Sequence, residues 1–245
     1  DLTLNSETQQ TMSVSQGRVQ LLKAMILESG INEIEISTLC TQILSEKKGA
    51  SISRSRFDFA INSVLGTRIE ALSPKTTQTF NAFLRSIYTT FVSKKGGWAN
   101  ANELACGFIV LCKGRKSEKL EYAFEMLDTE KKGWITGSQM FSFLKSFLTV
   151  LIHISSCELG DQPSEIAVSC TDAMGIVIPN KDVIAEVSSW ATKQVFKAMS
   201  DSRNKSFKDT AINFDNFADW YTNGGYSNMA WLELLDLEKW ILLST

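Results

Sequence analysis

The chain has little proline and histidine, with three prolines and one histidine in 245 residues. Few prolines favour long helices, because proline in a helix interior removes a backbone donor and breaks the helix. The five cysteines form no Cys-x-x-Cys pair, and with a single histidine this argues against a Cys/His zinc site. The sequence also lacks any run of 18 or more apolar residues, so no membrane-spanning helix is expected.

A large excess of charge of one sign is also absent, since the net charge is -2. Residues 1–120 hold 15 Lys and Arg against 10 Asp and Glu, whereas residues 121–245 hold 10 against 17. Neither half is basic enough to predict nucleic-acid binding from charge. Hydrophobic residues make up 44% of the chain, which is enough for a sizeable core.

The unpaired cysteines indicate reduced thiols, most of them in the core. We therefore expect a reducing intracellular compartment, cytoplasmic by default. An organelle stays open, because the chain begins at Asp1 and its start can be a processed one.

Sequence signatures of enzymes are missing as well, since no P-loop, GxGxxG or GxSxG motif occurs. The single histidine, His153, follows the apolar run FLTVLI, and we expect it at a helix end or on the surface. Nothing converges on it that could form a triad or a metal site. The sequence thus predicts a protein without catalytic residues.

What the sequence does contain is a repeat of helix, short glycine-containing loop, aliphatic residue and helix, four times over. This unit is the EF-hand, whose 12-residue loop carries glycine at position 6 and an acid at position 12. We expect position 8 to pair with the neighbouring loop in a short β-bridge. The predicted fold is therefore all-α, with four EF-hand-like units in two paired lobes.

The repeats suggest a flexible lead-in at residues 1–15, a first lobe at 16–115 and a second lobe at 116–245. Within the second lobe, residues 153–183 read as an insertion with two of the three prolines. Residues 228–243 predict an extra C-terminal helix, too apolar to lie free in water. We expect this helix to dock in its own second lobe or in a partner.

Three of the loops lack the acids that calcium requires at positions 1, 3, 5, 9 and 12. Aligned on Ile52, loop one offers no carboxylate, with Ser45, Lys47, Gly49, Ser53 and Arg56 at these positions. Loop two offers a single acid, with Val92, Lys94, Gly96, Asn100 and Glu103. Loop four, aligned on Ile212, also offers one, with Lys205, Phe207, Asp209, Asn213 and Asn216.

Loop three is the best candidate, with Asp128 at position 1, Glu130 at position 3 and its glycine and aliphatic residue in place. Position 5, however, is Lys132 and position 12 is Gln139, which cannot grip the ion with two charged oxygens. We expect no metal and no other cofactor. If loop three binds calcium at all, the ligands are Asp128, Glu130 and Gln139, and the affinity is low.

The third repeat resembles the neuronal calcium sensor (recoverin-like) family over residues 114–140. The matched residues of the pattern E-K-L-x-x-A-F-x-x-x-D are Glu118, Lys119, Leu120, Ala123, Phe124 and Asp128. The run ELACGFIVLCKG before it and FADWYTNGGYSNMAWLELL near the end are also similar to that family. The resemblance implies four hands, at least one of them often unable to bind calcium, and a hydrophobic groove for a partner helix.

Aromatic and aliphatic residues at helical spacing are core candidates, and an EF-hand lobe held open exposes part of such a core as a groove. The predicted groove residues are Phe83, Ile87, Phe91, Phe108, Phe124, Phe143, Phe147, Trp220 and Trp231. The favoured function is a non-catalytic adaptor or structural subunit that binds an amphipathic helix of a protein partner without calcium. Two alternatives stay open: a calcium sensor using loop three, and a regulatory domain or subunit of a larger enzyme complex.

Overall fold

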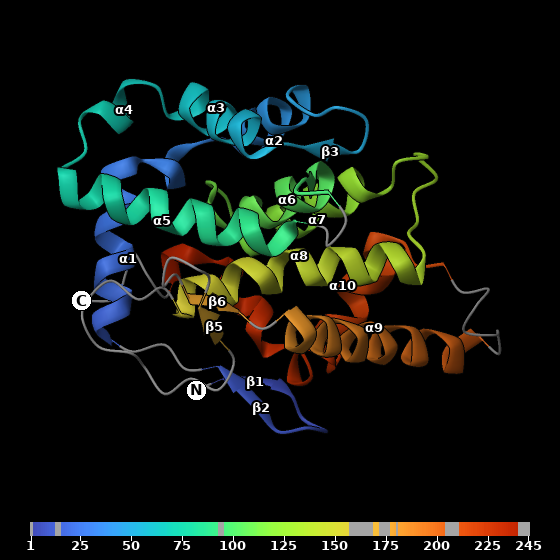
Figure 1. Cartoon of the computed structure of the whole chain (residues 1–245). Coiled ribbons are helices and arrows are strands. Elements are labelled where there is room, and N and C mark those ends of the chain that lie inside the picture. Colours follow the sequence, from blue (N-terminus) through green and yellow to red (C-terminus); the bar gives the residue numbers. More distant parts are fainter. Residues whose placement is uncertain are drawn as a thin grey trace.

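A computed structural model describes residues 2–12, 16–92, 96–156, 169–171, 177–179, 181–203 and 211–239. It is mainly helical, which confirms the predicted all-α, EF-hand-like fold (Figure 1). Within these residues, no helix is both long and apolar enough to cross a membrane.

The first two repeats fold as a pair of helix–loop–helix units. The first unit consists of α2 (Ile36–Ser45), β3 (Ser51–Ile52) and α3 (Arg54–Leu65). The second consists of α5 (Pro74–Phe91), β4 (Ala99–Asn100) and α6 (Ala101–Phe108). The two loops meet in an antiparallel ladder that pairs Ile52 with Ala99, so both loops have the register expected from the sequence.

The last two repeats form the second pair. Helices α7 (Lys116–Leu127) and α8 (Gly137–Ser156) flank loop three, and α9 (Lys181–Arg203) and α10 (Phe214–Thr222) flank loop four. Ile135 and Ile212 exchange backbone hydrogen bonds of 2.9 and 3.1 Å, which is the predicted bridge between the two loops.

Helix starts follow from short polar side chains that satisfy the free N–H groups of the first turn. Ser53, Ser73, Asn100 and Asn213 each accept a hydrogen bond from a backbone N–H two or three residues later. Pro74 follows Ser73 at the first position of α5, where a missing N–H costs nothing. The first half also contains α1 (Gln16–Ser29) and the short elements η1 (Ile31–Glu33), α4 (Thr67–Glu70) and η2 (Ile109–Leu111).

Helix α8 runs through the middle of the molecule and joins the two pairs (Figure 1). It packs against α5 and α6 on one side and α9 on the other. The contact with α6 is close at Gly107, where a Cβ atom would lie 2.8 Å from the Ser146 carbonyl oxygen and 2.9 Å from Val150. Glycine is therefore required there for the two backbones to approach.

Residues 2–12 correct the expectation of a flexible lead-in. They form an antiparallel hairpin of β1 (Leu2–Asn5) and β2 (Gln10–Met12), which contacts α9 and the C-terminal segment. Leu4 and Met12 are buried. These two apolar side chains join the polar stretch to a core formed by distant elements.

Residues 153–183 are described in part: α8 extends to Ser156, and β5 (Ser169–Thr171) pairs antiparallel with β6 (Val177–Pro179). The rest of this predicted insertion, up to the start of α9, lies outside the described residues.

The predicted C-terminal helix is corrected in its first half. After η4 (Gly225–Ser227), residues Ala230–Leu235 form the 3₁₀ helix η5. A 3₁₀ helix aligns residues three apart, which places Leu232 and Leu235 on the same side, and both are buried. The segment packs against α7, α8 and β1, so it docks in its own second lobe. Residues 240–243 of the predicted helix lie outside the described residues.

Candidate functional site

Loop three holds its first carboxylate with its own backbone. Asp128 follows α7 and is buried, and its two oxygens accept hydrogen bonds from the N–H groups of Lys132 (3.1 Å) and Gly133 (2.6 Å). Gly133 has φ of 77°, a left-handed conformation that glycine adopts without strain. The loop therefore turns around the Asp128 carboxylate.

Gln139 closes the other end of loop three. Its Oε1 accepts hydrogen bonds from the Thr136 N–H and the Thr136 hydroxyl, both at 2.9 Å. Its Nε2 donates to the carbonyl of Leu127 at 2.8 Å, at the start of the loop. A glutamate could replace the acceptor contacts but not this donor. The amide thus connects the two ends of the loop, which a bound ion does in a working EF-hand.

Glu130, the remaining predicted calcium ligand of loop three, is exposed and forms an ion pair with Lys132. The carboxylate raises the pKa of Lys132, because it stabilises the ammonium by a hydrogen bond and by charge. The structure therefore brings the three predicted calcium ligands together in loop three, but the polar side-chain atoms of each already contact another group of the chain.

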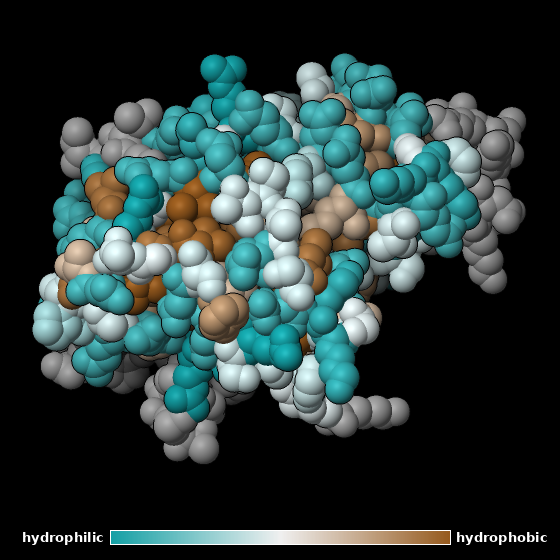
Figure 2. Space-filling view, turned by 90° about the horizontal axis from the view of Figure 1, so that it is seen from above, coloured by the Kyte–Doolittle hydropathy of each residue, from teal (hydrophilic) through white to brown (hydrophobic). Residues whose placement is uncertain are grey.

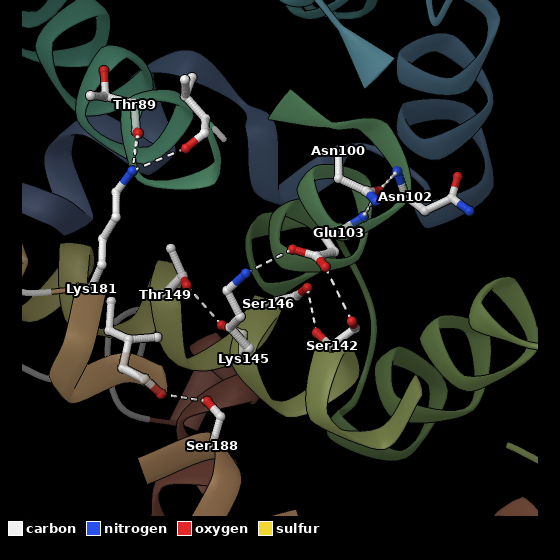
Figure 3. Close-up of polar contacts among 12 residues, drawn as sticks. Thr89, Asn100, Asn102, Glu103, Ser142, Lys145, Ser146, Thr149, Lys181 and Ser188 are labelled. Carbon is white, nitrogen blue, oxygen red and sulfur yellow. Dashed lines mark hydrogen bonds and ion pairs between the residues drawn. The ribbon is translucent and has the colours of Figure 1, made fainter. Parts of the chain in front are cut away.

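Loop two uses its single acid for a different purpose. Glu103 accepts hydrogen bonds from Lys145 Nζ (3.0 Å) and Ser142 Oγ (3.1 Å), both on α8 (Figure 3). This ion pair is partly buried between the two halves of the molecule. Glu103 is at position 12 of loop two, where a working EF-hand has its bidentate calcium ligand, but here it contacts the second lobe.

Loop one has no acid among its ligand positions, and Arg56 at position 12 forms an ion pair with Glu46 at 3.0 Å. In loop four, Lys205, Phe207 and Asp209 lie outside the described residues. Across the described ranges, no group of three or more His, Cys, Asp or Glu side chains is arranged to hold a metal ion.

A second contact also fixes loop two to the second lobe. Lys181, the first residue of α9, donates from Nζ to the carbonyls of Thr89 (3.0 Å) and Val92 (3.1 Å) at the end of α5 (Figure 3). A cation at a helix C-terminus satisfies free carbonyls and complements the helix dipole. Neither Lys181 nor Lys145 stands in a local sequence motif, so sequence reasoning did not find them.

Between these contacts lies a cleft of about 770 Å³. It is bordered by the end of α5, loop two, and the sides of α8 and α9. Its apolar lining comes from Phe91, Val92, Trp98, Phe141 and Ile184. The volume is in the range of pockets that hold a small molecule or a few side chains.

The predicted groove residues are mostly inside the core. Eight are buried: Phe83, Ile87, Phe91, Phe108, Phe124, Phe143, Phe147 and Trp231. Trp220 is partly buried, and of the whole set only Phe91 also lines the cleft. On the face seen in Figure 2, hydrophobic residues reach the surface in patches divided by hydrophilic ones. A groove lined by these nine residues remains a prediction that requires the lobes to open.

Two buried ionisable side chains were not predicted as such. His153 lies in the last turn of α8, at a helix end as expected, but it is buried and not on the surface. Its Nδ1 is 2.6 Å from the Thr149 carbonyl oxygen, and its Nε2 is 3.1 Å from the Thr90 hydroxyl. Lys119 is also buried, and its Nζ donates to the carbonyls of Val110 and Leu235. Burial lowers the pKa of His153 to about 4 and that of Lys119 to about 8.

The three cysteines whose side chains are described are free and buried, as expected. Burial raises the pKa of Cys112 to about 12, and it also raises the pKa values of Cys40 and Cys106. Such thiols stay protonated and have low reactivity, which fits a structural role.

These features define the chain as a helical EF-hand-like protein whose described loops are held by internal contacts. No family model matches it. Over 71 residues, 29% of the chain, it is 31% identical to calcium-binding protein NCSA of Dictyostelium discoideum. The match spans 38% of that relative's length. The similarity supports a calcium-binding-like helical protein.

Proposed function

We propose that the chain is a non-catalytic adaptor or structural subunit of EF-hand-like fold, which keeps its shape without calcium and binds a helical segment of a protein partner. The observation that carries the proposal is the Gln139 bridge, because it closes loop three from within the chain. Asp128 and Glu130 support it, since their carboxylates are engaged by backbone N–H groups and by Lys132.

The contacts of loop two support the same conclusion. Opening of the second hand by calcium would require Glu103 to leave Lys145 and bind the ion. The ion pair, together with Lys181 at the end of α5, opposes that movement. The loops then serve to hold the lobes in one arrangement, with no metal-driven change.

The cleft beside α8 is the part of the described surface that best suits a partner segment. Apolar side chains line it, and Lys145 and Thr149 supply polar groups at its edge. The C-terminal segment already covers part of the second lobe, where Trp231 and Leu232 are fully buried. We therefore expect a partner helix to bind at the cleft rather than in the second lobe.

A calcium sensor is the second candidate, favoured by the name of the Dictyostelium discoideum relative. Calorimetric titration with calcium, with magnesium as the control, separates the two. We expect no binding heat from the wild-type chain up to about 1 mM calcium, because no described loop presents a free bidentate acid.

The double variant Lys132→Asp, Gln139→Glu is the matched positive control. It supplies acids at positions 5 and 12 of loop three, and we expect a dissociation constant of about 10⁻⁵–10⁻⁴ M. A hydrophobic dye should bind the wild-type chain equally in calcium and in chelator. Tight calcium binding by the wild-type chain, with a calcium-dependent rise in dye binding, would replace the proposal by the sensor.

A further inference from the structure

Three of the four loops carry two adjacent lysines followed by glycine: Lys47-Lys48-Gly49, Lys94-Lys95-Gly96 and Lys131-Lys132-Gly133. In each pair one lysine stands at a ligand position of the loop, position 3 in loops one and two and position 5 in loop three, where calcium-binding loops carry an oxygen ligand. The repeated basic pair is not explained by the absence of calcium, since loss of a ligand does not by itself select lysine. It points to a partner with negative charge.

Tryptophan accompanies two of the basic pairs. Trp98 and Trp134 each precede the bridge residue of their loop, and their residues are 39% and 48% exposed. Trp190 and Trp231, in contrast, are buried. Two half-exposed indoles therefore stand at corresponding places in two loops, beside the exposed lysines.

The helices show that these loops lie at one end of the molecule. Glu103 near the start of α6 contacts Ser142 and Lys145, and Gly107 one turn later lies against Ser146. Both helices therefore advance in the same direction. Their first residues, which directly follow loops two and three, are at the same end.

Loop one belongs to the same end, because β3 pairs with β4 beside Trp98. Lys47, Lys48 and Lys131 are exposed, and no ion pair joins them to a carboxylate within the described part of the chain. Of the acids in loops one and three, Glu46 pairs with Arg56, Glu130 pairs with Lys132, and Asp128 accepts hydrogen bonds from backbone N–H groups.

We propose that this loop end, consisting of Lys47, Lys48, Trp98, Lys131 and Trp134, docks on an anionic lipid surface. Lysines near such a surface are attracted to its negative potential, and tryptophan rings settle at the level of the lipid headgroups. Several loop tips at one end of a molecule suit a flat partner.

A nucleic acid is less well matched. Its phosphates and bases are bound best by the planar fork of arginine. The arginines of loop one, Arg54 and Arg56, are both paired with carboxylates of the chain. The loop end therefore offers lysine and indole, with its guanidinium groups already engaged.

The test is co-sedimentation of the full chain with vesicles of phosphatidylcholine alone or with 30% phosphatidylserine added. We expect binding only to the anionic vesicles, and loss of binding as salt rises. Replacing Lys47, Lys48 and Lys131 by Glu should weaken it about 100-fold or more, since each lysine contributes about fivefold. Trp98→Ala with Trp134→Ala should weaken it about tenfold.

Two variants serve as matched controls. Lys75→Glu makes the same charge change on an exposed residue at the start of α5, the end opposite loop two, and Tyr226→Ala removes an exposed ring after α10. Both should bind like the wild-type chain, and circular dichroism checks that all variants are folded.

Brominated lipids should quench tryptophan fluorescence in the wild-type chain and much less in the double tryptophan variant. No binding to anionic vesicles at low salt would overturn the proposal, as would equal binding by loop and control variants. Binding to a duplex RNA that depends on the same lysines, without vesicle binding, would assign this end to a nucleic acid instead.

Discussion

His153 gives the chain a specific dependence of stability on pH. It is the single histidine of the sequence, and its buried ring is neutral, with Nδ1–H donating to Thr149 and Nε2 facing the Thr90 hydroxyl. Burial lowers its pKa in the folded state to about 4, against about 6.5 in an unfolded chain. The unfolded state therefore binds a proton between these values and the folded state does not.

The sign and size follow from proton linkage. As pH falls from 6.5 to 4, protonation favours the unfolded chain, so the free energy of unfolding decreases. With these two pKa values, the loss between pH 7.5 and pH 5 is about 2 kcal/mol. Carboxylates also titrate near the lower end of this range, so the contribution of His153 must be separated by a variant.

The measurement is urea unfolding of the wild-type chain and of His153→Gln at pH 7.5 and pH 5. Because the carboxylates are common to both proteins, the difference in unfolding free energy between them should change by about 2 kcal/mol in favour of the variant. Thr90→Val keeps the imidazole and should retain the wild-type pH dependence. Parallel stability curves for the wild-type chain and His153→Gln would refute the argument.

Two further predictions concern the contact between the lobes. Gly107→Val should lower the free energy of unfolding by about 1–3 kcal/mol, because the valine side chain would overlap α8. Gly17→Ala, in open space on α1, is the control and should be neutral or slightly stabilising. Thermal melts of the two variants test this difference. Glu103→Gln should cost about 1–2 kcal/mol by removing the partly buried pair with Lys145, and Glu35→Gln, in an exposed pair with Lys113, should cost clearly less. Equal costs in urea unfolding would contradict a role for Glu103 between the lobes.

The sequence alone determined the helical elements and the pairing of the loops. The repeat predicted a helix on each side of every loop, and in the structure α5 (Pro74–Phe91) and α6 (Ala101–Phe108) flank loop two. The position-8 rule aligned loops on Ile52 and Ile212, and both residues form the expected bridges. These features depend on residues close together in the chain, so periodicity and turn residues are sufficient to find them.

Only the tertiary structure decided where charged and polar side chains find partners. The Glu103–Lys145 pair, the Lys181 contacts with α5 and the burial of His153 join residues that are far apart in the sequence. The hairpin at residues 2–12 and the 3₁₀ form of η5 likewise depend on surfaces supplied by distant helices. Sequence spacing reports the local preference of a segment, whereas these contacts follow from how α8 brings the two lobes together.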